Sequence, residues 1–76
     1  MDLWIRSQDR YILTKNTNLY LSDEGIAYRI LNDNYDYLGE YKTKERALEV
    51  LDEIDQCMSE AVNNGLNMAH YVMPKE

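Results

Sequence analysis

The sequence predicts an α+β fold, in which an antiparallel sheet of about four or five short strands carries one long amphipathic helix packed on one face. Two observations predict this class. Residues up to about 42 are rich in Tyr, Ile, Leu, Thr and Asn in short runs, which is typical of strands and turns. Residues 44–64 repeat apolar side chains at three- and four-residue steps, which is typical of a helix. A chain of 76 residues closes only a thin core, so we expect a single domain, residues 1–76.

Short β-competent segments precede the helix, and turns separate them. The interruption at residues 16–18, Gly25 and the Asn-Asp-Asn run at 32–34 mark the turns, because Gly, Asn and Asp tolerate the backbone angles that turns need. Gly39 marks a bulge or a close approach of another segment. Strands so close in sequence pair antiparallel, as a meander. The predicted strands are residues 3–7, 11–15, 19–22, 26–31 and 35–41.

The helix is bounded by its own capping signals. Thr43 offers an N-cap hydroxyl, and Glu45 puts a carboxylate in the first turn, where the helix dipole favours it. Gly65 marks the end. The apolar stripe that should cover the sheet consists of Ala47, Val50, Leu51, Ile54, Met58 and Ala61. After the helix, residues 69–73 read as an edge strand that Pro74 ends.

Acidity is concentrated on the helix. The chain has 8 basic and 14 acidic residues, a net charge of -6, and residues 43–62 alone contribute two basic and six acidic side chains. One interpretation is the solvated face of an amphipathic helix. The other is a row of carboxylates that imitates phosphates and docks in a basic groove, and the lack of local compensation favours it. The carboxylates expected opposite the apolar stripe are Glu45, Glu49, Asp52, Glu53 and Glu60.

Aromatic residues give a second set of candidates. Tyr35, Tyr37 and Tyr41 share one strand face and would form a stripe, which is core if the helix covers it and a binding patch if it is bare. Trp4 poses the same choice. Because one helix covers only one face, the other face must meet solvent, a partner or a second copy of the chain. We therefore count Tyr35 and Tyr37 among the candidate partner-binding residues.

The sequence shows no motif or spacing for catalysis or metal binding. The single Cys57 and the single His70 form no expected pair, because Cys57 lies at the margin of the buried stripe and His70 in the tail. No glycine-rich phosphate loop and no Cys or His pair at zinc spacing occurs, and so small a fold has little room for a ligand pocket of roughly 300 Å³. We therefore predict no enzyme, no catalytic residue, no cofactor and no metal.

Composition also limits the compartment and the partners. One cysteine makes no internal disulfide, and the sequence has neither a signal peptide nor an apolar run of roughly 18 residues, so we expect a cytoplasmic protein. An acidic chain does not attract nucleic acid or anionic membranes by general charge, which predicts neither as a direct ligand. Its natural partners are basic protein surfaces.

Three segments together resemble a group of small proteins encoded in phages and prophages of Gram-positive bacteria. They are the opening Trp4-Ile5-Arg6-Ser7-Gln8-Asp9, the run from Leu38 to Ile54 (LGEYKTKERALEVLDEI) and the closing Tyr71-Val72-Met73-Pro74. The match spans nearly the whole chain. The resemblance implies a phage context, and it assigns no functional residue. Small acidic phage proteins without catalytic equipment are often inhibitors of host defence, and anti-CRISPR proteins are similar in size and charge.

These observations lead to one functional hypothesis and one alternative. The hypothesis is a non-enzymatic phage protein that inhibits a basic, nucleic-acid-binding host protein, most specifically a type II CRISPR effector nuclease, through an acidic surface that imitates nucleic acid. The alternative is a phage accessory or structural protein that self-associates, for example as a homodimer, through its uncovered sheet face.

Overall fold

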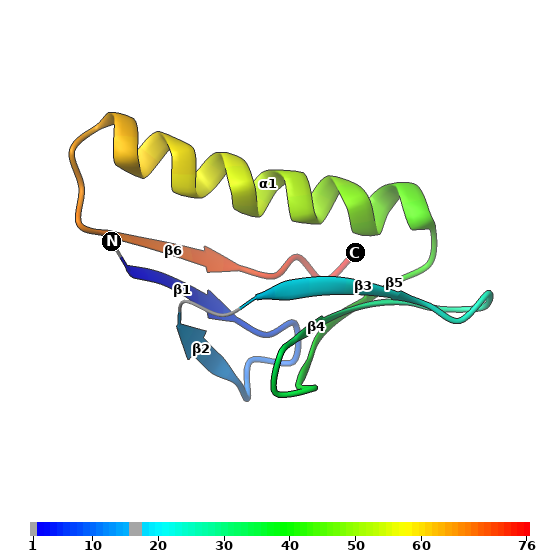
Figure 1. The fold of residues 1–76 in the computed structure, drawn as a ribbon. Helices are drawn as coiled ribbons and strands as arrows, with labels where there is room; N and C mark the ends of the chain where they lie inside the picture. The colour runs from blue at the N-terminus through cyan, green and yellow to red at the C-terminus, as the bar shows by residue number, and fades with distance from the viewer. Residues whose placement is uncertain (1, 16–17) are drawn as a thin grey trace.

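A computed structural model describes residues 2–15 and 18–76, and within them it confirms the α+β class (Figure 1). The predicted interruption at 16–18 falls partly on residues 16 and 17, which lie outside the described residues. The elements follow the predicted order, with a sixth strand after the helix. They are β1 (Asp2–Arg6), β2 (Leu13–Lys15), β3 (Leu19–Asp23), β4 (Tyr28–Asn32), β5 (Tyr37–Tyr41), α1 (Lys44–Asn63) and β6 (Met68–Val72).

The strands form two three-stranded sheets where the sequence suggested one. In the first sheet, of order β2-β1-β6, β2 runs antiparallel and β6 parallel to β1. The parallel pairing follows from the connection, because the long helix carries the chain back to the starting end of β1. The second sheet, β3-β4-β5, is the expected antiparallel meander. Gln8 joins the two sheets, donating its backbone N–H to the Leu38 oxygen at 2.7 Å.

The helix begins and ends as its capping residues predict. The hydroxyl of Thr43 accepts a hydrogen bond from the backbone N–H of Arg46 at 3.1 Å. At the other end Gly65 has a φ of 70°, and the N–H groups of Gly65 and Leu66 bond back to Val62 and Ala61 at 3.0 and 2.9 Å. This paired closure satisfies carbonyls that the helix end would otherwise leave unbonded.

The core lies between the helix and the inner sides of both sheets (Figure 1). In β1, Leu3 and Ile5 are buried, whereas Trp4 and Arg6 alternate with them on the outer side. One helix therefore covers the inner side of each sheet and leaves outer faces uncovered, as its length allows. The buried cluster consists of Leu3, Ile5, Ile30, Leu38, Tyr41, Ala47, Val50, Ile54, Ala61, Ala69 and Met73.

A β-bulge overturns the predicted tyrosine stripe. Ile30 pairs with Gly39 but Leu31 pairs with Tyr37, so the register shifts between the two pairs. An extra residue in β5 reverses the alternation on one side of the bulge. Tyr41 is consequently buried in the core, while Tyr37 is exposed on the other face and Tyr35 lies in the preceding turn with a φ of 65°. The prediction that Tyr35, Tyr37 and Tyr41 share one face is wrong for this reason.

Gly39 meets the expectation of a close approach. A Cβ atom at this position would lie 2.9 Å from the Tyr41 hydroxyl oxygen and 3.0 Å from the terminal methyl carbon of Met73. The glycine therefore lets the side chains of β5 and of the segment after β6 pack against the same stretch of backbone.

Candidate functional site

The outer face of α1 carries the strongest single-sign charge of the chain. Glu45, Glu49, Asp52 and Glu60 are all exposed, and we call these four residues the acidic helix face. None of them takes part in an ion pair with another described residue. Gln56 donates to a Glu60 oxygen at 3.1 Å, which leaves the charge in place. The face spans about 22 Å along the helix axis at 1.5 Å per residue.

Glu53, the fifth predicted carboxylate, has a structural role. Its two oxygens accept hydrogen bonds from the Tyr71 hydroxyl at 2.7 Å and from the Arg46 guanidinium at 3.0 Å. These two bonds lower the pKa of Glu53 below its usual range, while burial and the carboxylate together raise the pKa of Tyr71. Glu53 therefore ties the helix to β6, and less of its charge is available to a partner than the sequence suggested.

Arg46 also forms hydrogen bonds that stabilise the fold. Besides Glu53, it donates from Nε to the backbone oxygen of Glu76 at 3.0 Å, and the hydrogen bond to Glu53 raises its pKa. Arg46 and Lys44 are the two basic residues of the segment 43–62. With Arg46 engaged at the flank, the exposed Lys44 remains beside Glu45.

Asp55 is an acidic residue that the sequence reasoning left out. It is exposed and stands three residues after Asp52, so their side chains are neighbours on the helix surface. The same projection that selected the other carboxylates could have found it, because it lies at the edge of the same outer face. Including Asp55 widens the acidic surface toward the flank away from β6.

Tyr35 and Tyr37 do not join the acidic helix face. Their side chains are 77% and 59% exposed, but α1 packs against the inner side of the second sheet and Tyr37 lies on its outer side. The Arg29 guanidinium stands 5.0 Å from the centre of the Tyr37 ring and also pairs with Glu24 and Glu40. The predicted partner-binding residues therefore occupy two separate surfaces.

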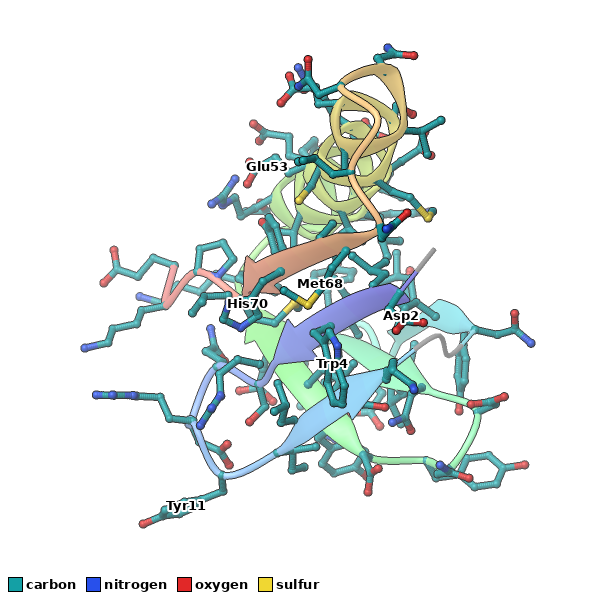
Figure 2. All side chains as sticks on the ribbon, turned by 90° about the vertical axis from the view of Figure 1, so that its left-hand side faces the viewer. Asp2, Trp4, Tyr11, Glu53, Met68 and His70 are labelled. Atoms are coloured by element: carbon teal, nitrogen blue, oxygen red, sulfur yellow. The ribbon has the colours of Figure 1, made fainter. Side chains whose placement is uncertain are left out.

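The first sheet exposes a different kind of surface on its outer side. Trp4 lies beside Lys15 of β2 and His70 of β6, and the Lys15 ammonium stands 5.4 Å from the centre of the Trp4 ring. Figure 2 shows Trp4, Met68 and His70 on this face. The sequence left the place of Trp4 open, and the structure puts its half-buried side chain here. We define the outer sheet face as Trp4, Arg6, Leu13, Lys15, Met68, His70 and Val72.

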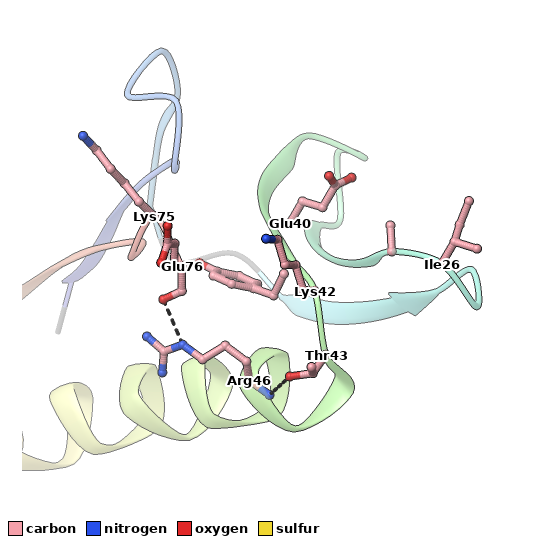
Figure 3. Close-up of a pocket in the computed structure, with 9 residues that line it drawn as sticks. Ile26, Glu40, Lys42, Thr43, Arg46, Lys75 and Glu76 are labelled. Atoms are coloured by element: carbon pink, nitrogen blue, oxygen red, sulfur yellow. Dashed lines mark hydrogen bonds between the residues drawn. The ribbon is translucent and has the colours of Figure 1, made fainter.

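A surface cleft of about 350 Å³ lies at the N-terminal end of α1, larger than the sequence reasoning allowed (Figure 3). The C-terminal tail makes this room by forming one wall, so the cleft takes no volume from the core. Tyr41 donates to the Pro74 oxygen at 2.8 Å and helps to hold that tail, and burial raises the pKa of Tyr41 to about 12. The lining contains neither cysteine nor histidine: Ile26, Ala27, Glu40, Tyr41, Lys42, Thr43, Arg46, Lys75 and Glu76.

The structure keeps the side chains of Cys57 and His70 apart. The thiol of Cys57 lies 3.9 Å from the backbone oxygen of His70, while the imidazole stands on the outer sheet face. A thiolate and a base within hydrogen-bonding reach would be needed for nucleophilic chemistry. Across residues 2–15 and 18–76, His, Cys, Asp and Glu form no group of three able to hold a metal ion.

Comparisons with known proteins give no assignment. The chain was compared with protein-family models, with curated proteins and with solved structures, and none of the three comparisons found a match. In the part of the chain that the structure describes, no helix combines the length and the hydropathy that crossing a membrane requires.

Proposed function

We propose that this protein acts without catalysis, by binding a basic surface of a nucleic-acid-binding protein through its acidic helix face. The observation that carries the proposal is the absence of any ion pair at Glu45, Glu49, Asp52 and Glu60 among the described residues. Charges that stabilise a fold are normally paired or hydrogen-bonded, as Glu53 is here. Charges left unpaired in a row contribute instead to the field outside the protein.

Physical reasoning favours a partner over solvation alone. Asp52 has Glu49 and Asp55 three residues away on either side, and such like-charge neighbours destabilise a helix slightly. A solvated face could reach the same solubility with mixed charges. A single-sign row, by contrast, steers a basic partner to one orientation and speeds its association.

The narrower form of the proposal concerns the partner. A DNA- or RNA-binding channel of a type II CRISPR effector nuclease is a long basic groove, and occupying it would exclude nucleic acid. This choice rests on the resemblance to small phage and prophage proteins, and the broader proposal stands without it. Both forms treat the helix as the contacting element and the core as its support.

Charge reversal on the helix tests the proposal. In Glu49→Lys/Asp52→Lys we expect binding to a purified, guide-loaded type II effector to fall by at least about tenfold in calorimetry, with target-DNA cleavage restored. Wild-type affinity should also fall steeply between about 0.05 and 0.3 M salt. The matched control compares two single substitutions, Asp52→Lys on the acidic helix face and Asp33→Lys outside it. Asp33→Lys, an exposed residue in the turn after β4, changes the charge as Asp52→Lys does and should leave binding nearly unchanged.

Two results would contradict the proposal. Binding that is indifferent to salt and to both helix substitutions would remove the acidic helix face from the interface. Failure of the effector to bind at all, while other basic nucleic-acid-binding proteins bind in a salt-dependent way, would reject only the narrower partner.

A further inference from the structure

The outer sheet face combines apolar and cationic side chains in adjacent rows of the first sheet. Across one row Trp4 lies between Lys15 and His70, and across the next Arg6 lies between Leu13 and Val72. Because every second residue of a strand points to the same side, these side chains all stand away from the core. None of them belongs to the buried cluster.

Three apolar side chains of this face are open to solvent around Trp4. The side chains of Leu13, Met68 and Val72 are 46%, 57% and 56% exposed, and Trp4 is half-buried between them. Scattered exposed apolar residues are normal on a protein surface, but a contiguous group around a tryptophan is typical of a binding surface. Trp, Met and Arg are also the residue types enriched at protein interfaces.

Charge on this face is opposite to that of the chain as a whole. Arg6 and Lys15 are cations on a protein of net charge -6, and neither forms an ion pair with a described residue. Arg6 donates to the backbone oxygen of Arg10 at 3.2 Å and Lys15 rests over the Trp4 ring, so neither of these contacts uses a carboxylate. Asp2, an acid, stands at the other end of β1 beside Met68.

We propose that the outer sheet face binds an acidic segment of another protein, one that carries Asp or Glu together with a large apolar side chain. The apolar side chain would cover Met68, Val72 and the Trp4 ring, and the carboxylates would meet Arg6 and Lys15. This surface goes beyond the acidic helix face, which calls for a basic partner and lies on the other side of the core.

Two other occupants fit less well. A second copy packed face to face in the parallel sense would bring the cations of two identical surfaces together, and in the antiparallel sense Asp2 could meet Arg6 but would leave Lys15 without a carboxylate partner. Single-stranded nucleic acid is bound mainly by several aromatic side chains on which successive bases stack. Here the face offers one large aromatic ring, Trp4, beside the imidazole of His70 and three apolar side chains, which gives no row of stacking platforms.

Selection from a random dodecapeptide library on the whole protein tests the chemistry of the occupant. The wild-type protein should enrich peptides that combine Asp or Glu with aromatic or branched apolar residues. A basic or uncharged consensus among the peptides that the wild type enriches and Arg6→Glu/Lys15→Glu does not would overturn the proposal, whereas basic peptides enriched by both proteins bind the acidic helix face. The best enriched peptide without tryptophan is then titrated against the protein, because the emission of Trp4, the single tryptophan of the chain, reports directly on the centre of the face.

Substitutions test whether the peptide binds to the cations of this face or to other cations of the protein. In Arg6→Glu/Lys15→Glu the dissociation constant should rise at least about tenfold, and Met68→Ala/Val72→Ala should weaken binding with the charges intact. The control Lys42→Glu/Lys44→Glu makes the same charge change at exposed positions away from the face and should bind as the wild type does. Circular dichroism verifies that each variant is folded. Undiminished binding by a folded Arg6→Glu/Lys15→Glu variant would reject the proposal.

Two further measurements compare the rival occupants directly. The wild type is titrated with an oligo(dT) strand and, separately, diluted without ligand while Trp4 emission and sedimentation are followed. We expect no saturable change with oligo(dT) and a monomer at all concentrations. Tighter binding of oligo(dT) than of the peptide, or a dimer that loses its mass in Met68→Ala/Val72→Ala, would assign the face to nucleic acid or to a second copy instead.

Discussion

The acidic helix face and the outer sheet face both stand outside the core, yet they differ in how they relate to it. The four carboxylates of the acidic helix face are exposed, and none of them forms an ion pair with a described residue. Side chains of the outer sheet face lie in cross-strand rows, where neighbours such as Trp4 and Lys15 contact one another. The acidic helix face therefore acts through its charge, whereas the side chains of the outer sheet face pack against one another.

This difference determines whether a substitution on each surface also changes the stability of the fold. Carboxylates on a helix can change without altering the fold, so their pattern is free to follow a partner's charge. Residues on a sheet face also contribute to strand pairing. A substitution there changes stability and binding together, and the two effects must be measured separately.

The largest expected effect compares the two sides of β1. Ile5 is 1% exposed in the core, and Ile5→Ala should lower the free energy of unfolding by about 3 kcal/mol through a lost side chain and a residual cavity. Trp4→Ala, one position away on the outer side, should cost less, about 2 kcal/mol, because the half-buried ring lies at the surface and its removal leaves no enclosed cavity. Urea unfolding followed by circular dichroism measures both. A larger loss for Trp4→Ala would mean that the outer sheet face is built for stability.

The next effect concerns Glu53, a helix carboxylate whose hydrogen bonds also stabilise the fold. Its hydrogen bonds to Tyr71 and Arg46 lower its pKa in the folded state, so ionised Glu53 stabilises the fold above its unfolded pKa of about 4.5. That contribution is lost as the pH falls through the lower folded pKa. Because 44% of the Glu53 side chain is exposed and solvent screens its charge, Glu53→Gln should reduce the free energy of unfolding by only about 0.5–1 kcal/mol near neutral pH and by much less in acid.

Urea unfolding of Glu53→Gln across this pH range checks the sign. The matched control is Glu49→Gln, which removes the same charge one helical turn away at an exposed position. An equal pH dependence in both variants would mean that Glu53 stabilises the fold only through general charge, and that its contacts to β6 add nothing.

Much of the fold could be predicted because local signals and packing agree. Thr43 and Gly65 cap the helix where the sequence suggests, since both act through neighbouring backbone groups. The split into two sheets and the parallel pairing of β6 were not predicted. They depend on which strand edges meet in space, as at the Gln8 contact with Leu38, and no pattern within a single segment contains that information.

The sequence predicted which charges the candidate site carries, but not which distant residues contact them. Helical projection identified four exposed carboxylates but missed Asp55, and Glu53 proved to be bound because Tyr71, eighteen positions later, returns beside it. The tyrosine stripe failed at the bulge opposite Ile30, where one extra residue moved Tyr37 and Tyr41 to different faces. Trp4 and Met68 joined one surface only through the pairing of β1 with β6.

The smallest expected effect gives the sharpest test of the acidic helix face. Asp52→Asn removes one charge between Glu49 and Asp55 and keeps the side-chain shape, so relief of repulsion should raise the free energy of unfolding by about 0.2–0.5 kcal/mol at low salt. The gain should vanish near 1 M salt, where screening acts within about 3 Å. A face that serves only solvation would show this gain and lose nothing. If the face binds a basic partner, the same variant is more stable and binds less tightly, and that opposition would show that the repulsion is maintained for binding.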